Sequence, residues 1–550
     1  MFVGNLKKIN LSTSMFERLI TKGQFYVDKT RFIENFLEEA SDVMLITRQR
    51  RLGKSLNMDT LRCFLTDSVD NRHLFKGLYI ESSHVWEEAH AWPVFKFDFK
   101  LLTADDYCEQ IAALVDEQLC SYTDPKKLNN RLKRRYNSLV TGLKNPTHSL
   151  RLLTEIVYDL TGKCTYILID EYDKLLMDNY NSEKYEELRT FMQNLFSAAF
   201  KDNPYLEKAL LTGVMRISKE SIFSSLNNIS VFDIFNDNMY TNDYGFTEEE
   251  VQCIGKYTDL DIDEVRKWYN GIRVNGIPIY NTFSFSSYLK HKQFECFWSM
   301  SGTMDMIIDL LNDERMLVLT ALLNQEPQEV PIEKRISVKL LSKHTGDKAF
   351  YSLVAQTGYL SILEWRDTSA IVTIPNKELV YVWRNFIIDA LNIDEKQIRT
   401  MFDNVDNESA FSKDVEYFLT DRLSFHDLAK YSGENSEKAH ERAYHLYLLG
   451  ILSAFEDVSC RFPLSNRESG NGRYDIWVER PHVSVIFELK ACDSKDGLDK
   501  KAQEALEQID AKRYGAELAP GKKLIKAGIA FYKKSCRVRV KTAKLSIFLA

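Results

Sequence analysis

A short apolar stretch that runs directly into a Gly-Lys-Ser tripeptide constrains this chain more than any other feature. Residues 43–47 read Val-Met-Leu-Ile-Thr, and residues 48–56 read Arg-Gln-Arg-Arg-Leu-Gly-Lys-Ser-Leu. The pattern predicts a buried strand, a loop and the start of a helix. A helix start offers free backbone N–H groups and a positive dipole end to an anion. The sequence therefore predicts a phosphate-binding loop over residues 48–56.

The residue types in this loop indicate which groups would contact a nucleotide. In the pattern G-x-x-x-x-G-K-[ST], the lysine reaches the β- and γ-phosphates and the hydroxyl binds Mg²⁺. Lys54 and Ser55 are placed for these two roles. The other cofactor-binding residues expected in the loop are Arg51, Gly53 and Leu56. Arg48 stands where the pattern has Gly, so an ordinary helix N-terminus stays open as the alternative for this motif alone.

A second apolar stretch ends in two carboxylates. Residues 166–169 are apolar, and Asp170 and Glu171 follow, which is typical of a buried parallel strand with a polar carboxyl end. In phosphate-loop ATPases an acid at this place holds Mg²⁺, and Asp170 fits that role. Glu171 is then placed to orient or deprotonate an attacking water. Together the two stretches favour a nucleotide site over an ordinary buried strand that ends in a polar loop.

Length and composition define the class of protein. A chain of 550 residues is long enough for about three or four domains, and 44% hydrophobic and 27% charged residues are ordinary for a soluble globular protein. No apolar stretch approaches the roughly 18 residues of a membrane span, and residues 1–10 lack the apolar core of a signal peptide. The nine cysteines are scattered without a C-x-x-C pair, so we expect reduced thiols in a cytoplasmic protein.

Charge is unevenly distributed along the chain. The net charge of −7 does not suit a molecule that binds nucleic acid over its whole surface. The last fifty residues, by contrast, contain 12 Lys and Arg against 4 Asp and Glu. This basic tail could contact phosphates. It could equally be the solvated surface of strands and helices, and the sequence leaves both readings open.

Strand and helix patterns alternate through the first 245 residues. Strands are predicted over residues 43–47, 94–99, 166–170 and 209–212. Helices are predicted over residues 56–66, 107–122, 149–160 and 183–200. This alternation predicts a parallel sheet covered on both faces, with ligands at the carboxyl ends of the strands. We therefore expect an α/β domain of the P-loop NTPase type.

Helical patterns dominate after residue 245. Thr247 and Glu250 have the spacing of a capping box, so a helix is expected to begin there. Between residues 321 and 393, helices mix with short β stretches, which resembles a small winged-helix module; a plain helical linker is the alternative. A polar stretch at residues 404–412 suggests a boundary. The predicted domains are residues 1–245, 246–400 and 401–550.

A second chemical site is predicted near the C-terminus, in a hairpin. Two β stretches flank Pro481 and His482, which indicates a turn. Asp475 and Glu488 each lie six residues from that turn, so they should be directly opposite on the two strands. Lys490 follows Glu488 by two residues and should project from the same face.

Two carboxylates held together repel unless a cation lies between them. A divalent metal suits such hard oxygen ligands, lowers the pKa of a bound water and polarises a phosphodiester. Lys490 could orient that water or neutralise charge in the transition state. An exposed hairpin with cross-strand charge pairs is the alternative. Gln508 and Tyr514, on the predicted helix 502–514, are further polar groups for such a site, and Glu441 on a preceding helix could supply a third acid.

Together these motifs resemble one known family, the AAA-ATPase-like proteins with a C-terminal PD-(D/E)XK nuclease-type domain, which are abundant in gut bacteria. The resemblance extends in one order over nearly the whole chain. It is carried by residues 25–30, 48–56, 166–173, 211–218, 244–246, 268–271, 279–281, 472–475, 488–490 and 508–514.

The resemblance implies ATP and Mg²⁺ (or Mn²⁺) as cofactors, and it makes a loop with Arg48 in place of Gly normal. The phosphate-site roles pass to Lys54, Ser55, Asp170 and Glu171. Arg216 would sense the γ-phosphate or act as a cis arginine finger, with a structural ion pair as the alternative. Asp28 and Lys29 belong to the family's N-terminal motif without an assigned chemical role. Thr282 stands where the family usually has Pro, which affects only a local turn.

In the C-terminal part, the resemblance implies the D…ExK site of metal-dependent phosphodiesterases. Asp475, Glu488 and Lys490 match that pattern, Glu441 takes the place of a helical acid, and Gln508 and Tyr514 match a Q…Y helix. The catalytic residues expected on this basis are Glu171, Asp475, Glu488, Lys490 and Gln508. The metal ligands expected in the two sites are Ser55, Asp170, Glu441, Asp475 and Glu488.

Two functions follow as expectations. The first is an ATP-binding and ATP-hydrolysing enzyme whose AAA-type domain positions a metal-dependent nuclease on DNA or RNA. The alternative is a nucleotide-gated switch whose nuclease-like domain binds a protein or nucleic-acid partner without cleavage. No membrane partner is expected. Related ATPases often form ring hexamers, so a homo-oligomer is compatible with the sequence, although no residue requires one.

Overall fold

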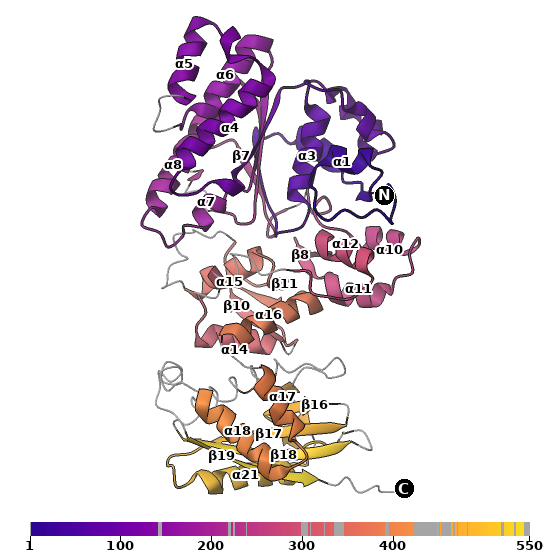
Figure 1. The fold of residues 1–550 in the computed structure, drawn as a ribbon, viewed down its shortest axis with the longest axis vertical. Helices are drawn as coiled ribbons and strands as arrows, with labels where there is room; N and C mark the ends of the chain where they lie inside the picture. The colour runs from indigo at the N-terminus through magenta and orange to yellow at the C-terminus, as the bar shows by residue number, and fades with distance from the viewer. Residues whose placement is uncertain are drawn as a thin grey trace. The chain divides into compact units, whose positions relative to one another are not determined.

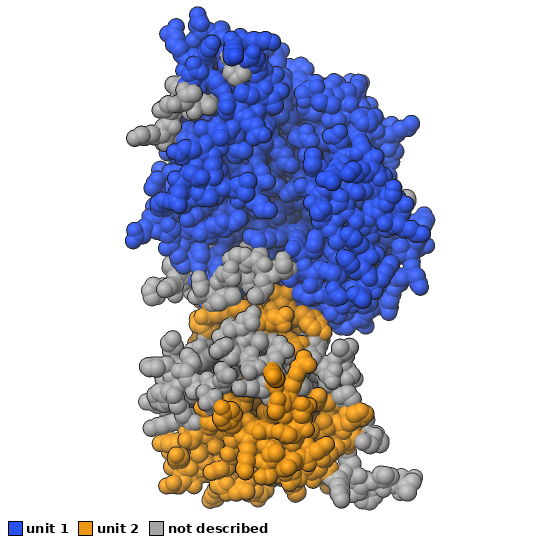
Figure 2. Space-filling model, viewed as in Figure 1, with its two compact units in different colours: residues 1–310, 329–379 blue, residues 311–328, 380–550 orange. Residues whose placement is uncertain are grey.

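The structure is a computed structural model that describes most of the chain. The described residues are 2–140, 146–217, 222–223, 226–237, 239–298, 306–307, 310–323, 325–334, 346–390, 395–422, 448, 452, 464–465, 468–469, 471–480, 482–516, 518, 522–532 and 535–543. The chain forms two compact units (Figure 2): unit 1 is residues 1–310 with 329–379, and unit 2 is residues 311–328 with 380–550. Among the described residues, no helix is both long and apolar enough to cross a bilayer.

The centre of unit 1 is a five-stranded parallel sheet in the order β4-β5-β6-β3-β7. Its strands are β3 (Val43–Thr47), β4 (Val94–Asp98), β5 (Thr165–Asp170), β6 (Leu206–Gly213) and β7 (Ile229–Phe232). Every side chain of β3 and β5 is buried, as expected of inner strands that are covered on both faces. The unbroken apolar stretches in the sequence therefore predicted these strands correctly.

Helices cover both faces of this sheet: α1 and α3 lie on one side, and α4, α5, α6 and α8 lie on the other (Figure 1). The helices are α1 (Phe16–Thr21), α2 (Arg31–Glu38), α3 (Lys54–Leu65), α4 (Tyr107–Tyr122), α5 (Asn130–Val140), α6 (Ser149–Thr161), α7 (Lys174–Met177) and α8 (Tyr185–Phe200). The predicted α/β architecture is confirmed.

A helical region follows the sheet in unit 1. It contains α10 (Glu248–Gly255), α11 (Ile262–Tyr269) and α12 (Thr282–His291), with a short hairpin of β8 (Ile272–Val274) and β9 (Ile277–Ile279). The predicted capping box is confirmed: the Glu250 backbone N–H donates to the Thr247 hydroxyl at 3.3 Å, and the Thr247 N–H donates to the Glu250 carboxylate at 2.8 Å.

The N-terminal segment of the chain packs against this helical region. Its strand β1 (Phe2–Val3) pairs antiparallel with β2 (Tyr26–Val27). Phe25 and Val27 then share one apolar cluster with Val251 of α10 and Phe285 of α12. The beginning of the chain and its helical region are therefore joined in one core.

Helices and strands alternate again in the middle of the sequence. The elements are α14 (Asp313–Leu323), β10 (Gln328–Pro331), α15 (Asp347–Gln356), β11 (Ser361–Trp365), β12 (Ser369–Thr373) and α16 (Lys377–Ala390). The strands form a small sheet in the order β10-β12-β11. The mixed pattern is thus present, while the winged-helix assignment and the three domain boundaries stay predictions.

Unit 2 contains a second five-stranded sheet, in the order β13-β16-β17-β18-β19. The sheet is antiparallel except for the parallel pair β17 and β18, which α21 (Leu498–Ala511) connects. The strands are β13 (Leu464–Ser465), β16 (Ile476–Glu479), β17 (Val483–Ala491), β18 (Lys523–Tyr532) and β19 (Ser535–Ala543), with a separate pair β14 (Glu468–Ser469) and β15 (Gly472–Arg473).

Each face of the second sheet has its own core. On one face, α17 (Glu395–Asp403) and α18 (Glu408–Arg422) pack on Phe487 and Leu489. On the other face, α21 packs on Ile486. Alternate residues of β17 therefore face opposite layers.

Candidate functional sites

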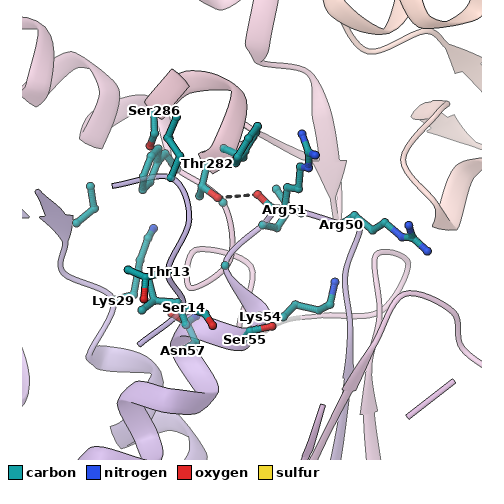
Figure 3. A pocket seen from close by; sticks show the side chains of 18 of the residues that line it. Thr13, Ser14, Lys29, Arg50, Arg51, Lys54, Ser55, Asn57, Thr282 and Ser286 are labelled. Atoms are coloured by element: carbon teal, nitrogen blue, oxygen red, sulfur yellow. Dashed lines mark hydrogen bonds between the residues drawn. The ribbon is translucent and has the colours of Figure 1, made fainter. Parts of the chain in front are cut away.

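The loop between β3 and α3 owes its shape to two residues with left-handed backbone. Arg51 has φ 64° and Gly53 has φ 88°, directly before α3 begins at Lys54. This conformation costs a non-glycine residue roughly 1–2 kcal/mol. Arg51 is held there because its carbonyl accepts the Thr282 hydroxyl at 2.6 Å (Figure 3) and its guanidinium lies 4.0 Å from the Phe283 ring centre. The loop is thereby fastened to α12.

Arg48, which stands where the general pattern has Gly, is turned into the protein interior. Its side chain is fully buried and forms an ion pair with the equally buried Asp237. The guanidinium also donates to the backbone oxygens of Thr47, at 2.8 Å, and Phe232, at 3.2 Å. Removing one partner of a buried ion pair leaves an uncompensated charge. Arg48 therefore belongs to the buried support beneath the loop.

A cavity of about 490 Å³ lies over this loop. We call it the nucleotide cavity. Lys54, Ser55 and Glu171 are among its lining residues. Its other charged lining residues are Lys29, Arg50, Arg51, Lys100, Lys174 and Asp243. Figure 3 shows the polar residues around it, among them Thr13, Ser14, Lys29, Arg50, Arg51, Lys54, Ser55, Asn57, Thr282 and Ser286. Its volume is in the range of small-molecule sites.

One side of the nucleotide cavity is apolar. Phe25, Val27, Phe246 and Phe283 contribute to its lining. An apolar surface beside a phosphate-type loop suits the flat base of a nucleotide, because small-molecule sites combine apolar walls with a few placed polar groups. Phe25 and Phe246 come from segments that are far apart in the sequence, so the sequence alone gave no sign of this wall.

Lys54 is buried at the loop and is held by it. Its ammonium donates to the backbone oxygens of Arg48 and Gln49, at 3.0 Å in each case. Lysine offers three donors, so phosphate oxygens could take over these bonds. The structure thus places the predicted lysine and the predicted hydroxyl of Ser55 at the start of one helix, beside one cavity.

The predicted acids lie at the same edge of the sheet as the loop. Asp170 ends β5 and accepts the Thr212 hydroxyl of β6 at 2.6 Å. Thr212 is paired with Ile46 of β3, so the loop and Asp170 leave the sheet on either side of β6. Glu171 follows directly and lines the nucleotide cavity. Lys54, Ser55 and Glu171 therefore line one cavity. Asp170 is the last residue of β5, which lies on the other side of β6 from β3.

Asp173 is a site residue that the sequence reasoning missed, although the segment 166–173 carried the resemblance. Its carboxylate accepts the backbone N–H groups of Val214, at 2.9 Å, and Met215, at 2.6 Å. Burial raises the pKa of Asp173 to about 7, and the charge of Glu171 adds to this rise. Asp173 therefore ties the end of β5 to the end of β6 beneath the predicted catalytic acid.

Arg216 forms an ion pair outside the lining of the nucleotide cavity. Its guanidinium donates to the buried Asp233 at 2.6 Å, and its backbone N–H donates to the Gln356 side chain at 3.2 Å. Arg216 is not among the described residues that line the nucleotide cavity. This arrangement matches the ion-pair alternative, and a role in sensing the γ-phosphate stays a prediction.

The structure supplies roles for Asp28 and Lys29. The Asp28 carboxylate accepts the Thr30 N–H at 2.9 Å and the Tyr79 N–H at 2.8 Å, so it organises the start of α2. The Lys29 ammonium donates to Glu250 at 2.7 Å and also lines the nucleotide cavity. Glu250 is the acid of the capping box, so α10 is positioned through the same residue that borders the cavity.

Thr282, the position where the family usually has Pro, is the first residue of α12. Asn281 caps this helix, because its side chain accepts the N–H groups of Phe283 and Ser284 at 3.0 Å. Proline is well tolerated at the first helical position. The turn is therefore kept, and the hydroxyl of Thr282 adds the hydrogen bond to Arg51.

The hairpin of unit 2 has the register that was counted from its turn. Ile476, the first residue of β16, pairs with Phe487 of β17, and this register continued by one residue sets Asp475 opposite Glu488. Asp475 also accepts the Leu489 N–H at 2.7 Å. Both residues lie at this end of the hairpin, with Glu488 buried and Asp475 half-buried, and the approach of their carboxylates stays a prediction.

A glutamine on α21 joins the lysine of this site to its buried acid. Glu488 and Lys490 share the face of β17 that α21 covers, because they alternate with Phe487 and Leu489. The Lys490 ammonium donates to the Gln508 side-chain oxygen at 2.7 Å, and the Gln508 amide donates to Glu488. The carboxylate oxygens of Asp475 and Glu488 are the kind of ligand that a hard divalent cation prefers.

Comparisons with known proteins match two separate stretches of the chain. Residues 10–223 match the family described as "Predicted AAA-ATPase", and residues 439–541 match the PD-(D/E)XK nuclease superfamily. The chain joins an AAA-ATPase-like domain to a PD-(D/E)XK nuclease-superfamily domain. The resemblance inferred from the motifs is confirmed.

A curated relative and a solved structure are also similar to this chain. The relative is an uncharacterized protein in the vnfD 5' region of Azotobacter chroococcum mcd 1, 31% identical over 366 residues, which are 65% of this chain and 64% of that protein. The structure of Drosophila ORC bound to AT-rich DNA and Cdc6 aligns over 67% of this chain and 91% of that one, at 12% identity and a TM-score of 0.18. At that score the alignment supports no transfer of fold or function.

A glycine allows α21 of the nuclease-superfamily domain to approach its sheet. Gly528 of β18 is paired with Glu488, and a Cβ at Gly528 would lie 2.3 Å from the backbone oxygen of Ala502. A larger residue would push the helix, and with it Gln508, away from the strand. A glycine within a strand pattern is the signal that would have indicated this close approach.

Tyr514 and Glu441 were the other residues predicted for the nuclease-superfamily domain. Tyr514 is buried, burial raises the pKa of its hydroxyl, and its ring meets Tyr474 edge-on at 6.3 Å. Glu441 lies outside the described residues.

The basic tail of the nuclease-superfamily domain is largely ion-paired. Lys522 binds Glu479 at 2.6 Å, and Arg539 binds Asp499 at 2.5 Å. Further pairs in the described residues are Lys523 with Asp406, Lys526 with Asp510, and Lys541 with Asp510. These contacts favour the solvated-surface alternative for the tail over a dedicated phosphate-binding surface.

Proposed function

We propose that this protein is an ATP-binding and ATP-hydrolysing AAA-type ATPase coupled to a metal-dependent nuclease that acts on nucleic acid. The observation that carries the proposal is the arrangement in unit 2, where Asp475 lies opposite Glu488 and one glutamine joins Glu488 to Lys490. The loop at Lys54 and the nucleotide cavity support the ATPase half.

In the ATPase half, each residue has a defined task. Lys54 exchanges its two carbonyl partners for oxygens of the β- and γ-phosphates. Ser55 and Asp170 would hold Mg²⁺, which neutralises phosphate charge when it is bound. Glu171 orients the attacking water at the cavity wall. Arg216 reaches the γ-phosphate only if it gives up Asp233, so its task depends on breaking that ion pair.

In the nuclease half, Asp475 and Glu488 would hold Mg²⁺ or Mn²⁺, and Glu441 is proposed as a further ligand. When bound there, such a cation would lower the pKa of a water and would polarise the phosphodiester. Lys490 holds its ammonium near Glu488, where it orients the attacking water or stabilises negative charge on the phosphate. Gln508 positions that ammonium through the 2.7 Å hydrogen bond.

ATP turnover and strand cleavage should be measured together on the full chain. Single-stranded and double-stranded DNA and RNA would each be incubated with Mg·ATP, with and without Mn²⁺, and with a chelator as the control. The proposal expects ATP turnover together with cleavage that the chelator abolishes. Steady ATP turnover without cleavage of any of the four substrates, in the presence of Mn²⁺, would overturn the nuclease half.

A second candidate function is a nucleotide-gated switch in which the nuclease-superfamily domain binds a partner without cleavage. The observation in its favour is that Gln508 already engages both Lys490 and Glu488 within the domain. Thermal unfolding with increasing Mn²⁺ separates the two candidates. A midpoint that rises with Mn²⁺ and loses this rise in Asp475→Asn favours the nuclease, whereas an unchanged midpoint favours the switch.

A further inference from the structure

A second cavity in unit 1, of about 790 Å³, is surrounded by lysines. The N-terminal segment of residues 6–12 and the end of α12 line it, and they contribute Lys7, Lys8, Lys290 and Lys292. None of its described lining residues is acidic. We call this cavity the lysine groove. Its lysines come from two segments almost three hundred residues apart, so the sequence showed no basic cluster here.

The four ammonium groups of the lysine groove are exposed and available. All four residues are exposed, and within the described part of the chain none of their ammonium groups takes part in an ion pair or a side-chain hydrogen bond. This contrasts with the ion-paired basic tail of unit 2. A hollow lined by uncompensated charge of one sign concentrates ligands of the opposite charge.

An exposed aromatic ring stands among these lysines. Tyr257 is 66% exposed and lines the lysine groove, and Phe2 holds its ring edge-on at a centre distance of 5.5 Å. Lysines beside an exposed aromatic ring are what proteins use to bind single-stranded nucleic acid, because bases stack on the ring while phosphates meet the cations. An acidic protein segment would satisfy the charges but would leave the ring unused.

The N-terminal side of the lysine groove is fixed in place. The backbone oxygen of Lys8 accepts the Phe25 N–H at 3.2 Å, and the Asn10 side chain donates to Gln24 at 3.0 Å. Lys7 and Lys8 are therefore presented from an anchored backbone rather than from a free end. A pre-ordered surface loses less conformational freedom when a ligand binds.

The lysine groove and the nucleotide cavity share a wall. Ile9, Asn10 and Leu11 line both. A strand in the groove and a nucleotide in the cavity would contact the same three residues. When two ligands contact the same segment, the binding of one can change the affinity for the other, and the change in affinity is the same in both directions.

We propose that the lysine groove binds single-stranded nucleic acid, with phosphates on Lys7, Lys8, Lys290 and Lys292 and a base on Tyr257, and that residues 9–11 couple this binding to that of the nucleotide. The inference goes beyond the proposed nuclease, because it assigns polynucleotide binding to unit 1 and requires no cleavage. The claim that the groove binds nucleic acid is independent of the proposed ATP site, and only the claim that the two binding events are coupled rests on that site.

The test is the binding of a short fluorescent oligothymidylate to the full chain, followed by anisotropy at several salt concentrations. All proteins carry Lys490→Ala, so that cleavage does not enter the measurement. Lys290→Glu/Lys292→Glu is compared with Lys76→Glu/Lys126→Glu, which has the same charge change at exposed lysines that do not line the groove. Tyr257→Ala is the third protein.

The proposal expects Lys290→Glu/Lys292→Glu to weaken binding at least about tenfold and to lower the salt slope by about 1.4, at about 0.7 per phosphate contact of a single strand. Tyr257→Ala should weaken binding without changing that slope, and the control should bind like the parent. Equal binding by the groove variant and the control would overturn the proposal. Displacement of the oligonucleotide by polyglutamate, with no effect of Tyr257→Ala, would assign the groove to an acidic protein instead.

The coupling half is tested by the affinity for Mg·ATP with and without saturating oligonucleotide. The shift should equal the shift in oligonucleotide affinity produced by saturating Mg·ATP, and it should vanish in Lys290→Glu/Lys292→Glu. Unchanged ATP affinity would overturn the coupling while leaving the groove assignment in place. Failure to bind ATP at all would instead contradict the proposed function, so the two failures are distinguishable.

Discussion

The two candidate sites hold their lysines in different ways. In the AAA-ATPase-like domain, Lys54 is bonded to backbone carbonyls of its own loop and borders a cavity of about 490 Å³. In the nuclease-superfamily domain, Lys490 is bonded to a side chain, Gln508, which also engages Glu488. The first site is shaped by main-chain conformation, and the second depends on a few side chains that must stay in contact.

This difference predicts where each site is sensitive to substitution. The loop site should respond to changes that alter its backbone or its attachment to α12. The hairpin site should respond to changes at the interface between β17 and α21. The loss of one lysine should therefore reduce activity more in the hairpin site, where a side chain holds the lysine, than in the loop site, where backbone carbonyls hold it.

The largest effect is expected for Lys490→Ala. Cleavage should fall about 10²–10³-fold, because losing one group that stabilises developing charge has an effect of that size. ATP turnover should be unchanged. Single-turnover cleavage of a labelled strand provides the measurement, with Lys500→Ala, an exposed lysine of α21, as the matched control. Cleavage at the wild-type rate would show that the hairpin site is not the centre of the reaction.

A smaller loss is expected for Lys54→Ala. Charge-assisted hydrogen bonds contribute about 1.5–3 kcal/mol, so the dissociation constant for Mg·ATP should rise about tenfold to a hundredfold. Titration calorimetry measures it directly, and Lys76→Ala is the control. Unaltered ATP affinity would mean that the loop does not hold the phosphates, and the comparison of the two lysines would then lose its basis.

Gly528→Ala tests whether the contact between β18 and α21 holds the nuclease-superfamily site together. The new Cβ would meet the backbone of α21, and overpacking of this kind destabilises by about 1–3 kcal/mol. Urea unfolding should show this loss, together with slower cleavage, because Gln508 moves with the helix. Gly346→Ala, where a Cβ meets no atom within 4 Å, should have the smaller effect.

The smallest effect is expected for Thr282→Val, which removes the hydroxyl that binds the Arg51 carbonyl. One hydrogen bond contributes about 1 kcal/mol, so ATP affinity should fall roughly fivefold as the loop loosens. Thr282→Ser keeps the hydroxyl and should bind ATP like the parent. If both variants behave alike, attachment to α12 does not set the loop's conformation.

Local patterns predicted the parts of the structure that depend on neighbouring residues. The apolar stretch 43–47 became β3 because every position in an inner parallel strand is buried. The capping box at Thr247 needs only residues three apart. The register of Asp475 and Glu488 followed by counting from the hairpin turn. In each case the information lies within a few residues of the feature.

Contacts between distant segments were beyond the reach of those patterns. The ion pair of Lys29 with Glu250 and the burial of Arg48 against Asp237 depend on how the chain folds back on itself. Charge counting left two readings of the basic tail open for the same reason, since the sequence does not show that Lys522 and Arg539 are ion-paired. It also gave no sign of the four lysines that line the groove of unit 1. Local composition does not record which charges are neutralised in three dimensions.

If the loop binds a nucleotide as proposed, the two carbonyl oxygens that hold Lys54 would also set a threshold for ligand selection. An incoming molecule must offer the ammonium better acceptors than two neutral backbone groups, and charged oxygens form roughly twice as strong a bond. Nucleosides lack such acceptors, while di- and triphosphates carry several. The loop would then reject uncharged analogues through an exchange of partners, without any clash of shape.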